Sequence, residues 1–238
     1  MKRQEETAYP LRINKYLAYR GYSTRRGADE IITKGQVFIN GRLAVLGDKV
    51  EKSDKVEVRF RGKQKPYIYI AYNKPKGILT HSAQEGERDI KQEVAIKEVF
   101  PIGRLDKDSR GLIILTNDGR ITERLLGPKY LHEKEYLVKV KGSLRSNFKE
   151  KMEAGVQIEN EKTGKCKVEI VNKNTFKIIL TEGKKHQIRR MCVALFQEVE
   201  DLRRIRIMNI QLASLEEGKS RKIEGEELQT FLHSLDLP

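Results

Sequence analysis

A short polar and basic segment, from Arg59 to Pro66, most constrains the fold, because it contains little that could be buried in a core. Its composition is typical of a linker, and the proline at its end favours an extended chain. The apolar patterns on either side are therefore expected to form separate units. We predict a disordered arm, a small domain, a linker and a larger domain over residues 1–10, 11–58, 59–66 and 67–238.

Positive charge is concentrated in the first part of the chain. Residues 1–66 carry sixteen Lys or Arg against eight Asp or Glu, a net charge of +8 out of +14 for all 238 residues. A basic protein of this kind usually has an anionic partner, most often nucleic acid. A membrane surface is the weaker alternative, since no apolar run approaches the roughly 20 residues that a membrane span needs.

The two cysteines, Cys166 and Cys192, lie in separate segments without a nearby cysteine. This spacing is neither a disulfide framework nor a zinc-ligand pattern. The polar stretch from Met1 to Pro10 lacks the apolar core of a secretory signal. We therefore expect a cytoplasmic protein.

The small domain is predicted to contain two helices and a hairpin. Residues 11–40 have the pattern of a helix, a turn at Gly21, a second helix and a strand, with Ser23 and Thr24 as candidate N-caps. Asn40-Gly41 between alternating apolar residues predicts a tight primed turn. A further strand is expected around Val56 and Val58.

The larger domain contains both the 3.6-residue apolar periodicity of helices and the two-residue alternation of strands. This mixture indicates an α+β fold with a mainly antiparallel, mixed sheet flanked by helices. Strands are expected over residues 67–72, 113–115, 136–140, 166–171 and 176–180. Helices are expected over residues 90–99, 121–126, 144–154 and 185–195.

The segment from Gly103 to Leu112 holds Asp106 between Arg104 and Arg110, just before an apolar strand. A carboxylate among cations on a loop indicates chemistry, because a paired cation keeps a partly buried Asp ionised. A polyanionic substrate would meet both kinds of charge at this loop.

The spacing of Asp106 and Asp108 raises two other possibilities, a calcium-binding loop and a pair of catalytic carboxylates. As a calcium loop beginning at Asp106, the segment has Arg110 at the fifth position and Asn117 at the twelfth, where oxygen ligands and a glutamate are required. We therefore expect no metal. Glycosidase chemistry uses a pair of carboxylates, but two aspartates two residues apart do not by themselves establish such a pair.

The first domain resembles the small alpha-L RNA-binding motif of a ribosomal small-subunit protein. The resemblance is carried by Arg12 to Leu17, Ser23 to Ala28 and Gly35 to Gly41. It implies RNA contacts by polar residues of these strings, whereas the alternative is an ordinary solvated face. The candidates are Arg12, Asn14, Lys15, Arg25, Arg26 and Asn40.

The larger domain resembles the pseudouridine synthases that modify ribosomal RNA, the family typified by the small-subunit synthase A. Gly103 to Asp106 with Gly111-Leu112 resembles the central motif, His132 to Val138 the tyrosine-bearing motif and Glu182 to Met191 the basic C-terminal motif. Further strings resemble the branch of the family that acts on large-subunit (23S) ribosomal RNA. These strings are Gly86 to Asp89, Val99 to Ile102, Lys107 to Ser109, Lys165 to Val168 and Arg204 to Asn209, whereas Asn73 to Gly77 agrees with the family as a whole.

The resemblance implies isomerisation of uridine to pseudouridine, which needs no redox change and hence no cofactor. Asp106 would be the essential carboxylate, either attacking the ribose or removing a ribose proton, with Arg189 paired to it and Arg104 helping. Tyr136 would stack on the target uracil, and Ile188 would form a wall of the base pocket. His186 is assigned no catalytic role. The remaining substrate-contact candidates are Lys74, Lys134, Lys185, Gln187 and Arg190.

The predicted protein is a cytoplasmic, monomeric RNA pseudouridine synthase without DNA or membrane partners. Its leading substrate is a 23S ribosomal RNA stem-loop, with a transfer-RNA anticodon arm as a second candidate. The alternatives are a 16S ribosomal RNA synthase and a non-catalytic RNA-binding or ribosome-assembly protein. One departure from the family is Phe196, where a glycine usually follows the C-terminal helix.

Overall fold

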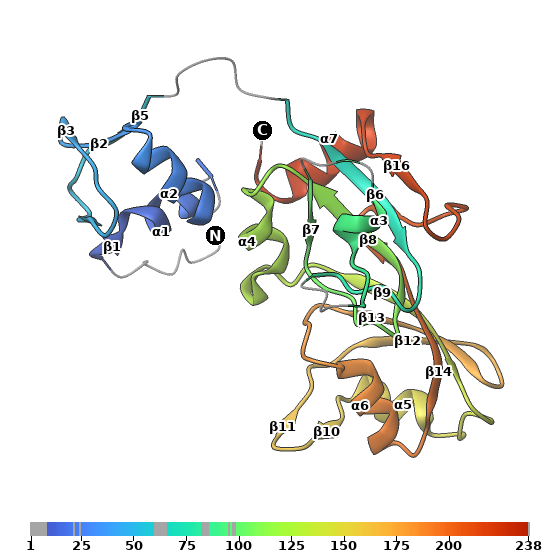
Figure 1. Cartoon of the computed structure of the whole chain (residues 1–238). Helices are drawn as coiled ribbons and strands as arrows, with labels where there is room; N and C mark the ends of the chain where they lie inside the picture. The colour runs from blue at the N-terminus through green and yellow to red at the C-terminus, as the bar shows by residue number, and fades with distance from the viewer. Residues whose placement is uncertain are drawn as a thin grey trace. The chain divides into compact units, whose positions relative to one another are not determined.

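The computed structural model describes residues 9–20, 22–23, 25–59, 66–81, 86–94, 96 and 99–237 (Figure 1). The chain divides into two compact units, one holding the residues up to Tyr67 together with Asp118–Arg124, the other holding Ile68–Asn117 and the chain from Leu125 onward. The predicted arm, the predicted linker and the candidate cap Thr24 lie largely or wholly outside the described residues. A small module therefore precedes a larger α+β unit, as expected for the fold class.

Up to Tyr67, the described residues of the first unit form two short helices and five short strands around one core. Strand β2 pairs with both β3 and β5, and β1 pairs with β4, all antiparallel. Leu17, Ala28 and Val37 from the two helices and β2 are fully buried in this core. The elements are β1 (Leu11–Arg12), α1 (Ile13–Tyr19), α2 (Arg25–Thr33), β2 (Val37–Ile39), β3 (Arg42–Leu43), β4 (Lys49–Val50) and β5 (Val56–Val58).

The predicted hairpin is confirmed at Asn40-Gly41. Both residues have positive φ, 50° and 81°, and Ile39 pairs with Arg42 across the turn. A type I′ turn requires positive φ at both central residues, which Asn and Gly adopt most readily. The Asn40 amide is occupied within the domain, because its Nδ2 donates to Oδ1 of Asp54 at 2.8 Å and its Oδ1 accepts from the Lys55 backbone at 2.8 Å. Asn40 therefore shapes the turn, in contrast to its expected role as an RNA contact.

The second unit is built on a nine-stranded mixed sheet. Its order is β12-β13-β9-β14-β8-β6-β16, with β7 added to β8 and β15 added to β14 (Figure 1). Among the strands that the structure describes in this sheet, only β14 and β8 run parallel to each other, so the sheet is mainly antiparallel. The strands are β6 (Tyr69–Lys74), β7 (Phe100–Ile102), β8 (Arg110–Thr116), β9 (Lys134–Val140), β12 (Lys167–Asn172), β13 (Thr175–Leu180), β14 (Val199–Ile207), β15 (Ile210–Gln211) and β16 (Ser220–Lys222).

Short helices and one small hairpin complete this region of the chain. Strands β10 (Gln157–Ile158) and β11 (Glu161–Lys162) form the hairpin. The helices are α3 (Ile90–Glu93), α4 (Ile121–Leu126), the 3-10 turn η1 (Pro128–Tyr130), α5 (Phe148–Glu153), α6 (Gln187–Ala194) and α7 (Gly225–Ser234). No described helix has both the length and the apolar character that crossing a membrane requires.

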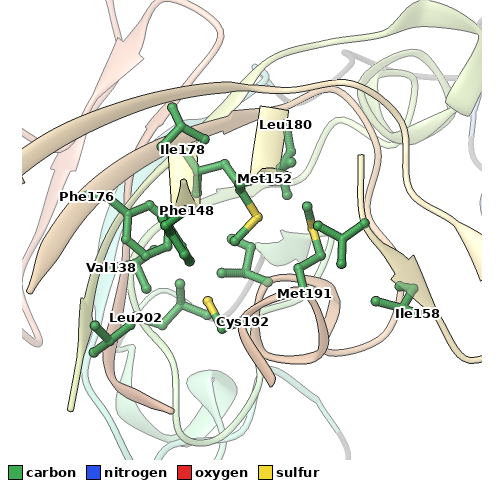
Figure 2. Close-up of a cluster of buried hydrophobic side chains, with 14 residues drawn as sticks. Val138, Phe148, Met152, Ile158, Phe176, Ile178, Leu180, Met191, Cys192 and Leu202 are labelled. Atoms are coloured by element: carbon green, nitrogen blue, oxygen red, sulfur yellow. The ribbon is translucent and has the colours of Figure 1, made fainter. Parts of the chain in front are cut away.

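Helices α5 and α6 pack on one end of the sheet through a shared core. Alternate residues of β9, β13 and β14 point to the same face, because successive side chains of a strand alternate. Figure 2 shows these strand residues around the apolar side chains of both helices. The labelled members are Val138, Phe148, Met152, Ile158, Phe176, Ile178, Leu180, Met191, Cys192 and Leu202. This core fixes α6 on the sheet.

Several elements differ from the sequence prediction. The helix expected over residues 144–154 covers only Phe148–Glu153, and the helix expected over 90–99 is described only for Ile90–Glu93. Strand β14 and helix α7 are not anticipated by the sequence at all. Five of the nine residues in β14 are charged, so the strand lacks the apolar alternation that identifies a buried strand.

Phe196 follows α6 at the position where the resemblance leads us to expect glycine. Its φ is 59° and its side chain is 76% exposed. The backbone keeps the left-handed conformation that a glycine adopts without strain. The Arg145 guanidinium covers the exposed ring at 4.8 Å from its centroid. Phe196 thus adopts the left-handed turn that was expected of a glycine.

Candidate active site

One row of paired residues crosses four strands of the large sheet. Lys74 of β6 pairs with Gly111 of β8, Gly111 pairs with Arg204 of β14, and Arg204 pairs with Tyr136 of β9. Paired residues of neighbouring strands point to the same face. The row therefore joins four stretches that are far apart in the sequence. It crosses β8 at Gly111, near the start of the strand and just after the loop that carries Asp106.

The loop that carries Asp106 connects β7 to β8 and is held by hydrogen bonds along its backbone. The Thr80 hydroxyl donates to the Leu105 carbonyl at 2.7 Å and accepts from the Leu105 amide at 3.0 Å. The amide of Ser109 donates to the Asp106 carbonyl at 3.0 Å. The amide of Gly77, from the turn after β6, donates to the Lys107 carbonyl at 2.8 Å. These contacts fix the backbone on both sides of the carboxylate.

The Asp106 carboxylate is 32% exposed, and its contact is His186. Nδ1 of His186 lies 3.1 Å from Oδ2 of Asp106. His186 precedes α6 with a φ of 50°, a conformation in which His is found more often than most residues. Sequence patterns assign His186 only a surface role, because the contact depends on the packing of α6 against the sheet.

Arg189 reaches the same loop but not the carboxylate. The sequence leads us to expect an ion pair between Arg189 and Asp106, whereas Nη2 of Arg189 donates to the Asp108 carbonyl at 2.9 Å and Nη1 to the Val199 carbonyl at 3.5 Å. α6 begins at Gln187, so Arg189 lies in its first turn and reaches the loop backbone beyond Asp106. Arg189 therefore holds the loop.

The two arginines that flank Asp106 in the sequence do not pair with it. Arg110 forms an ion pair with Asp201 at 2.7 Å and another with Glu217. Arg104 is exposed, and its guanidinium makes no hydrogen bond or ion pair within the described ranges. The Arg104 side chain is thus available to a ligand at the entrance to the site.

Lys74 has a different position from the one expected of a phosphate contact. Its side chain is fully buried, and its ammonium donates to the carbonyls of Pro75 at 2.9 Å and Ile78 at 2.6 Å. Burial lowers the pKa of Lys74 from 10.5 to about 8, the charges of Asp106 and Asp108 oppose this, and Arg204 lowers it further. Lys74 therefore supplies positive potential beneath the loop.

The lowered pKa of Lys74 predicts a pH-dependent stability. Between pH 8 and pH 10.5 the unfolded chain binds more protons at this site than the native protein does, so the native state gains stability as pH rises. At 1.36 kcal/mol per pKa unit, wild type should gain about 3 kcal/mol relative to Lys74→Met over this window. Denaturant unfolding of both proteins at several pH values measures the gain.

Lys76→Met is the matched control, because Lys76 lies two residues away and is exposed. Lys76→Met removes no buried charge, so it should not reproduce the gain of about 3 kcal/mol that distinguishes wild type from Lys74→Met between pH 8 and pH 10.5. A constant difference between wild type and Lys74→Met would mean that Lys74 titrates normally and that burial does not perturb it.

Two other residues predicted to contact the substrate, Gln187 and Arg190, bind side chains or backbone groups within the protein. Gln187 is buried, with Nε2 donating to Oε1 of Glu182 at 2.6 Å and Oε1 accepting from the Lys184 amide at 3.0 Å. Arg190 pairs with Glu159 at 2.9 Å. Gln187 therefore stabilises the start of α6, and its buried side chain is not exposed for contact with RNA.

Lys134 and Ile188 lie close to the row that crosses the sheet. The Lys134 ammonium donates to the His132 carbonyl at 3.2 Å, and burial, followed by the charge of Arg204, lowers the pKa of Lys134 to about 8. Ile188 is buried in the core of Figure 2, and partly buried Tyr136 packs against the same core. Tyr136 therefore lies where a wall of a base pocket could form.

The remaining basic candidates lie mostly at the surface. Lys185 is exposed beside His186, and Arg12, Lys15 and Arg25 are exposed in the first unit. Asn14 donates from Nδ2 to Oδ1 of Asp29 at 2.9 Å, which joins α1 to α2. The side chain of Arg26 lies outside the described part of the chain.

Comparison with known proteins gives the same assignment for both units. Residues 68–194 match the family model described as RNA pseudouridylate synthase, and residues 11–56 match the S4 domain. The chain is 42% identical to "Dual-specificity RNA pseudouridine synthase RluF" of Escherichia coli (strain K12) over 92% of this chain and 77% of that protein. It is 34% identical to "Ribosomal large subunit pseudouridine synthase B" of Bacillus subtilis (strain 168) over 92% of this chain and 94% of that protein.

The solved structures agree with these sequence matches. A pseudouridylate synthase crystal structure superimposes with a TM-score of 0.69 at 29% identity, covering 94% of this chain and 99% of that chain. The resemblance to the large-subunit branch is thereby confirmed, as is the assignment of the first unit to the ribosomal alpha-L, or S4, module. The chain belongs to the RNA pseudouridine synthases and carries an S4 RNA-binding domain ahead of its catalytic domain.

Proposed function

We propose that this enzyme isomerises a uridine in a stem-loop of large-subunit ribosomal RNA and accepts a transfer-RNA anticodon arm as a second substrate. The names of two relatives support the two parts of this proposal: one is called dual-specificity and the other is a ribosomal large-subunit synthase. A loop with unstacked bases is the feature of RNA that proteins read most readily, and both substrates can present one.

Asp106 is proposed as the essential carboxylate. Attack on the ribose and removal of a ribose proton both require the ionised form, and Lys74 provides positive potential beneath the loop. The glycosidic carbon–nitrogen bond breaks, the uracil rotates, and a carbon–carbon bond forms to the same ribose. Electrons and atoms balance within the nucleoside, so the reaction needs no redox partner.

Tyr136 is proposed to stack on the uracil after it leaves the RNA helix. An aromatic face replaces the lost base stacking, a contribution of roughly 1 to 3 kcal/mol per base. Exposed Arg104 and Lys185 are proposed to contact phosphates near the site, and Arg12, Lys15 and Arg25 to contact RNA in the S4 domain.

The row from Lys74 through Gly111 and Arg204 to Tyr136 carries the proposal, because it joins the motifs in one structural unit. We also propose that the enzyme acts as a monomer, because the proposed site needs no residue from a second chain. We place the reaction in the cytoplasm, where ribosomal and transfer RNA are available.

Single-turnover pseudouridine formation on purified large-subunit, small-subunit and transfer RNA tests the substrate assignment. Mapping the modified positions should give product on the large-subunit RNA, with a second position in a transfer-RNA anticodon arm. Product on small-subunit RNA alone would favour the 16S alternative. Tight binding without product on any RNA would favour a binding or assembly protein.

The contact between His186 and Asp106 predicts a positioning effect on turnover. His186→Ala removes the polar side chain that lies 3.1 Å from the Asp106 carboxylate and should slow the single-turnover rate on the order of tenfold. His186→Asn can place its amide nitrogen near the position of Nδ1 and should restore most of the rate. Equal rates for wild type and the alanine variant would show that the contact has no part in the reaction.

A further inference from the structure

Arg204 of β14 connects both ends of the segment that carries Asp106. Its side chain is buried, with 4% exposed. Nε donates to the Leu112 carbonyl at 2.7 Å, and Nη1 donates to the Arg104 carbonyl at 3.4 Å. One guanidinium thus bridges a residue before the carboxylate and a residue after it, and it does so from a strand about a hundred positions away in the sequence.

Hydrogen bonds also fix the backbone of the rest of this segment. Each carbonyl from Arg104 to Asp108 accepts a hydrogen bond, and each donor comes from a different residue. In order, the donors are Arg204, Thr80, the Ser109 amide, the Gly77 amide and Arg189. Two guanidiniums therefore hold the carbonyls that lie two residues before and two residues after Asp106. A backbone held at every residue keeps its side chain in one place.

The charges around Arg204 argue against a role in stability alone. The guanidinium makes no ion pair with a carboxylate among the described residues, and its Nη2 has no hydrogen-bond partner there. It is also close enough to two lysines, Lys74 and Lys134, to lower the pKa of each. Burying a cation beside like charges opposes folding, so such a residue is expected where function requires it.

We propose that Arg204 is a positioning residue for the pseudouridine synthase reaction, acting through the carbonyls of Arg104 and Leu112 to hold Asp106 against the ribose. The inference rests on the proposed role of Asp106. Lysine cannot substitute, because a single ammonium group lacks the planar set of donors that reaches two carbonyls at once.

The test compares Arg204→Lys with Arg203→Lys. Arg203 is the preceding residue on the same strand and points to the opposite face, and its side chain makes no hydrogen bond or ion pair in the described part of the chain. Arg204→Lys should lower the single-turnover rate at saturating RNA by about 100-fold, and its Kd for RNA should stay within about twofold of wild type. Arg203→Lys should leave both quantities within about twofold.

Hydrogen exchange supplies a readout that is independent of turnover. In Arg204→Lys the amides of Ser109 and Gly77 should exchange faster, whereas amides paired between β9 and β13 keep their protection. Arg204→Gln, which removes the buried charge, serves for the same measurements if the lysine variant does not fold.

Three results would bear directly on the inference. An unchanged rate in Arg204→Lys would overturn it. Faster exchange throughout the sheet, including β9 and β13, would also overturn it, because Arg204 would then act on global stability. Selective release of the loop amides in a protein whose wild type makes no pseudouridine would support Arg204 as the loop anchor and would refute the proposed function instead.

Discussion

Replacing Asp106 with Asn is expected to abolish pseudouridine formation and to leave RNA affinity within about twofold of wild type. Asn has the shape of Asp, and the hydrogen bonds that hold the loop are made by its backbone, so the loop should keep its geometry. It cannot ionise, and neither attack on the ribose nor removal of a ribose proton is then available. We expect the single-turnover rate to fall on the order of 10⁴-fold or more, as for other essential catalytic groups.

Asp108→Asn is the matched control for this loss. Asp108 lies on the same loop, is exposed, and holds Arg189 through its backbone carbonyl, which the substitution does not alter. Its single-turnover rate should stay within a few-fold of wild type, roughly the range of a changed surface charge. If Asp106→Asn retained turnover and Asp108→Asn lost it, the essential carboxylate would be Asp108.

Local sequence chemistry predicted the parts of the fold that depend on neighbouring residues. The Asn40-Gly41 turn was predictable, because positive φ at both central positions requires these residue types. Helix α4 begins and ends at the expected residues, Ile121 and Leu126. The loop position of Asp106 also followed from sequence, since Gly103 and Gly111 enclose a polar stretch before an apolar strand.

The contacts of the site were less predictable, because they depend on distant segments. Lys74 has the sequence surroundings of a surface lysine, and lysines are rarely fully buried, so its position under the loop carries no local signal. The partner of Asp106 is set by where α6 begins, which selects His186 rather than Arg189. A shift of one residue in that helix would change which side chain reaches the carboxylate.

Strand β14 is a part of the fold that sequence patterns likewise did not predict. Its alternation is hidden because Arg204 points inward together with Leu202, and an arginine at a core position resembles a surface residue in any periodicity argument. The strand is nevertheless central, pairing with β8 on one side and β9 on the other. An inward arginine in a sheet is costly, and the two carbonyls that it binds explain how it is accommodated.

Gly111→Ala is expected to destabilise the protein strongly. Gly111 has a φ of 106°, and a Cβ there would lie 2.3 Å from the Arg204 carbonyl oxygen and 2.7 Å from the Arg204 nitrogen. Both are backbone atoms of the neighbouring strand, so they cannot turn away as a flexible side chain could. The clash would push β8 from β14 and disturb the bridge that Arg204 makes to Arg104 and Leu112. We expect a loss of about 3 to 5 kcal/mol in unfolding free energy, together with loss of turnover.

Gly142→Ala separates this clash from backbone strain alone. Gly142 also has positive φ, 80°, but a Cβ there would meet nothing within 4 Å. Its substitution should cost only about 1 to 2 kcal/mol, the strain of a left-handed residue with a side chain, and should leave turnover unchanged. Urea unfolding of both variants measures the two losses, provided that the dependence of the unfolding free energy on urea concentration is the same in both. Equal losses would mean that β8 can move away from β14 at Gly111, and that the close approach of these strands does not hold the Asp106 loop in place.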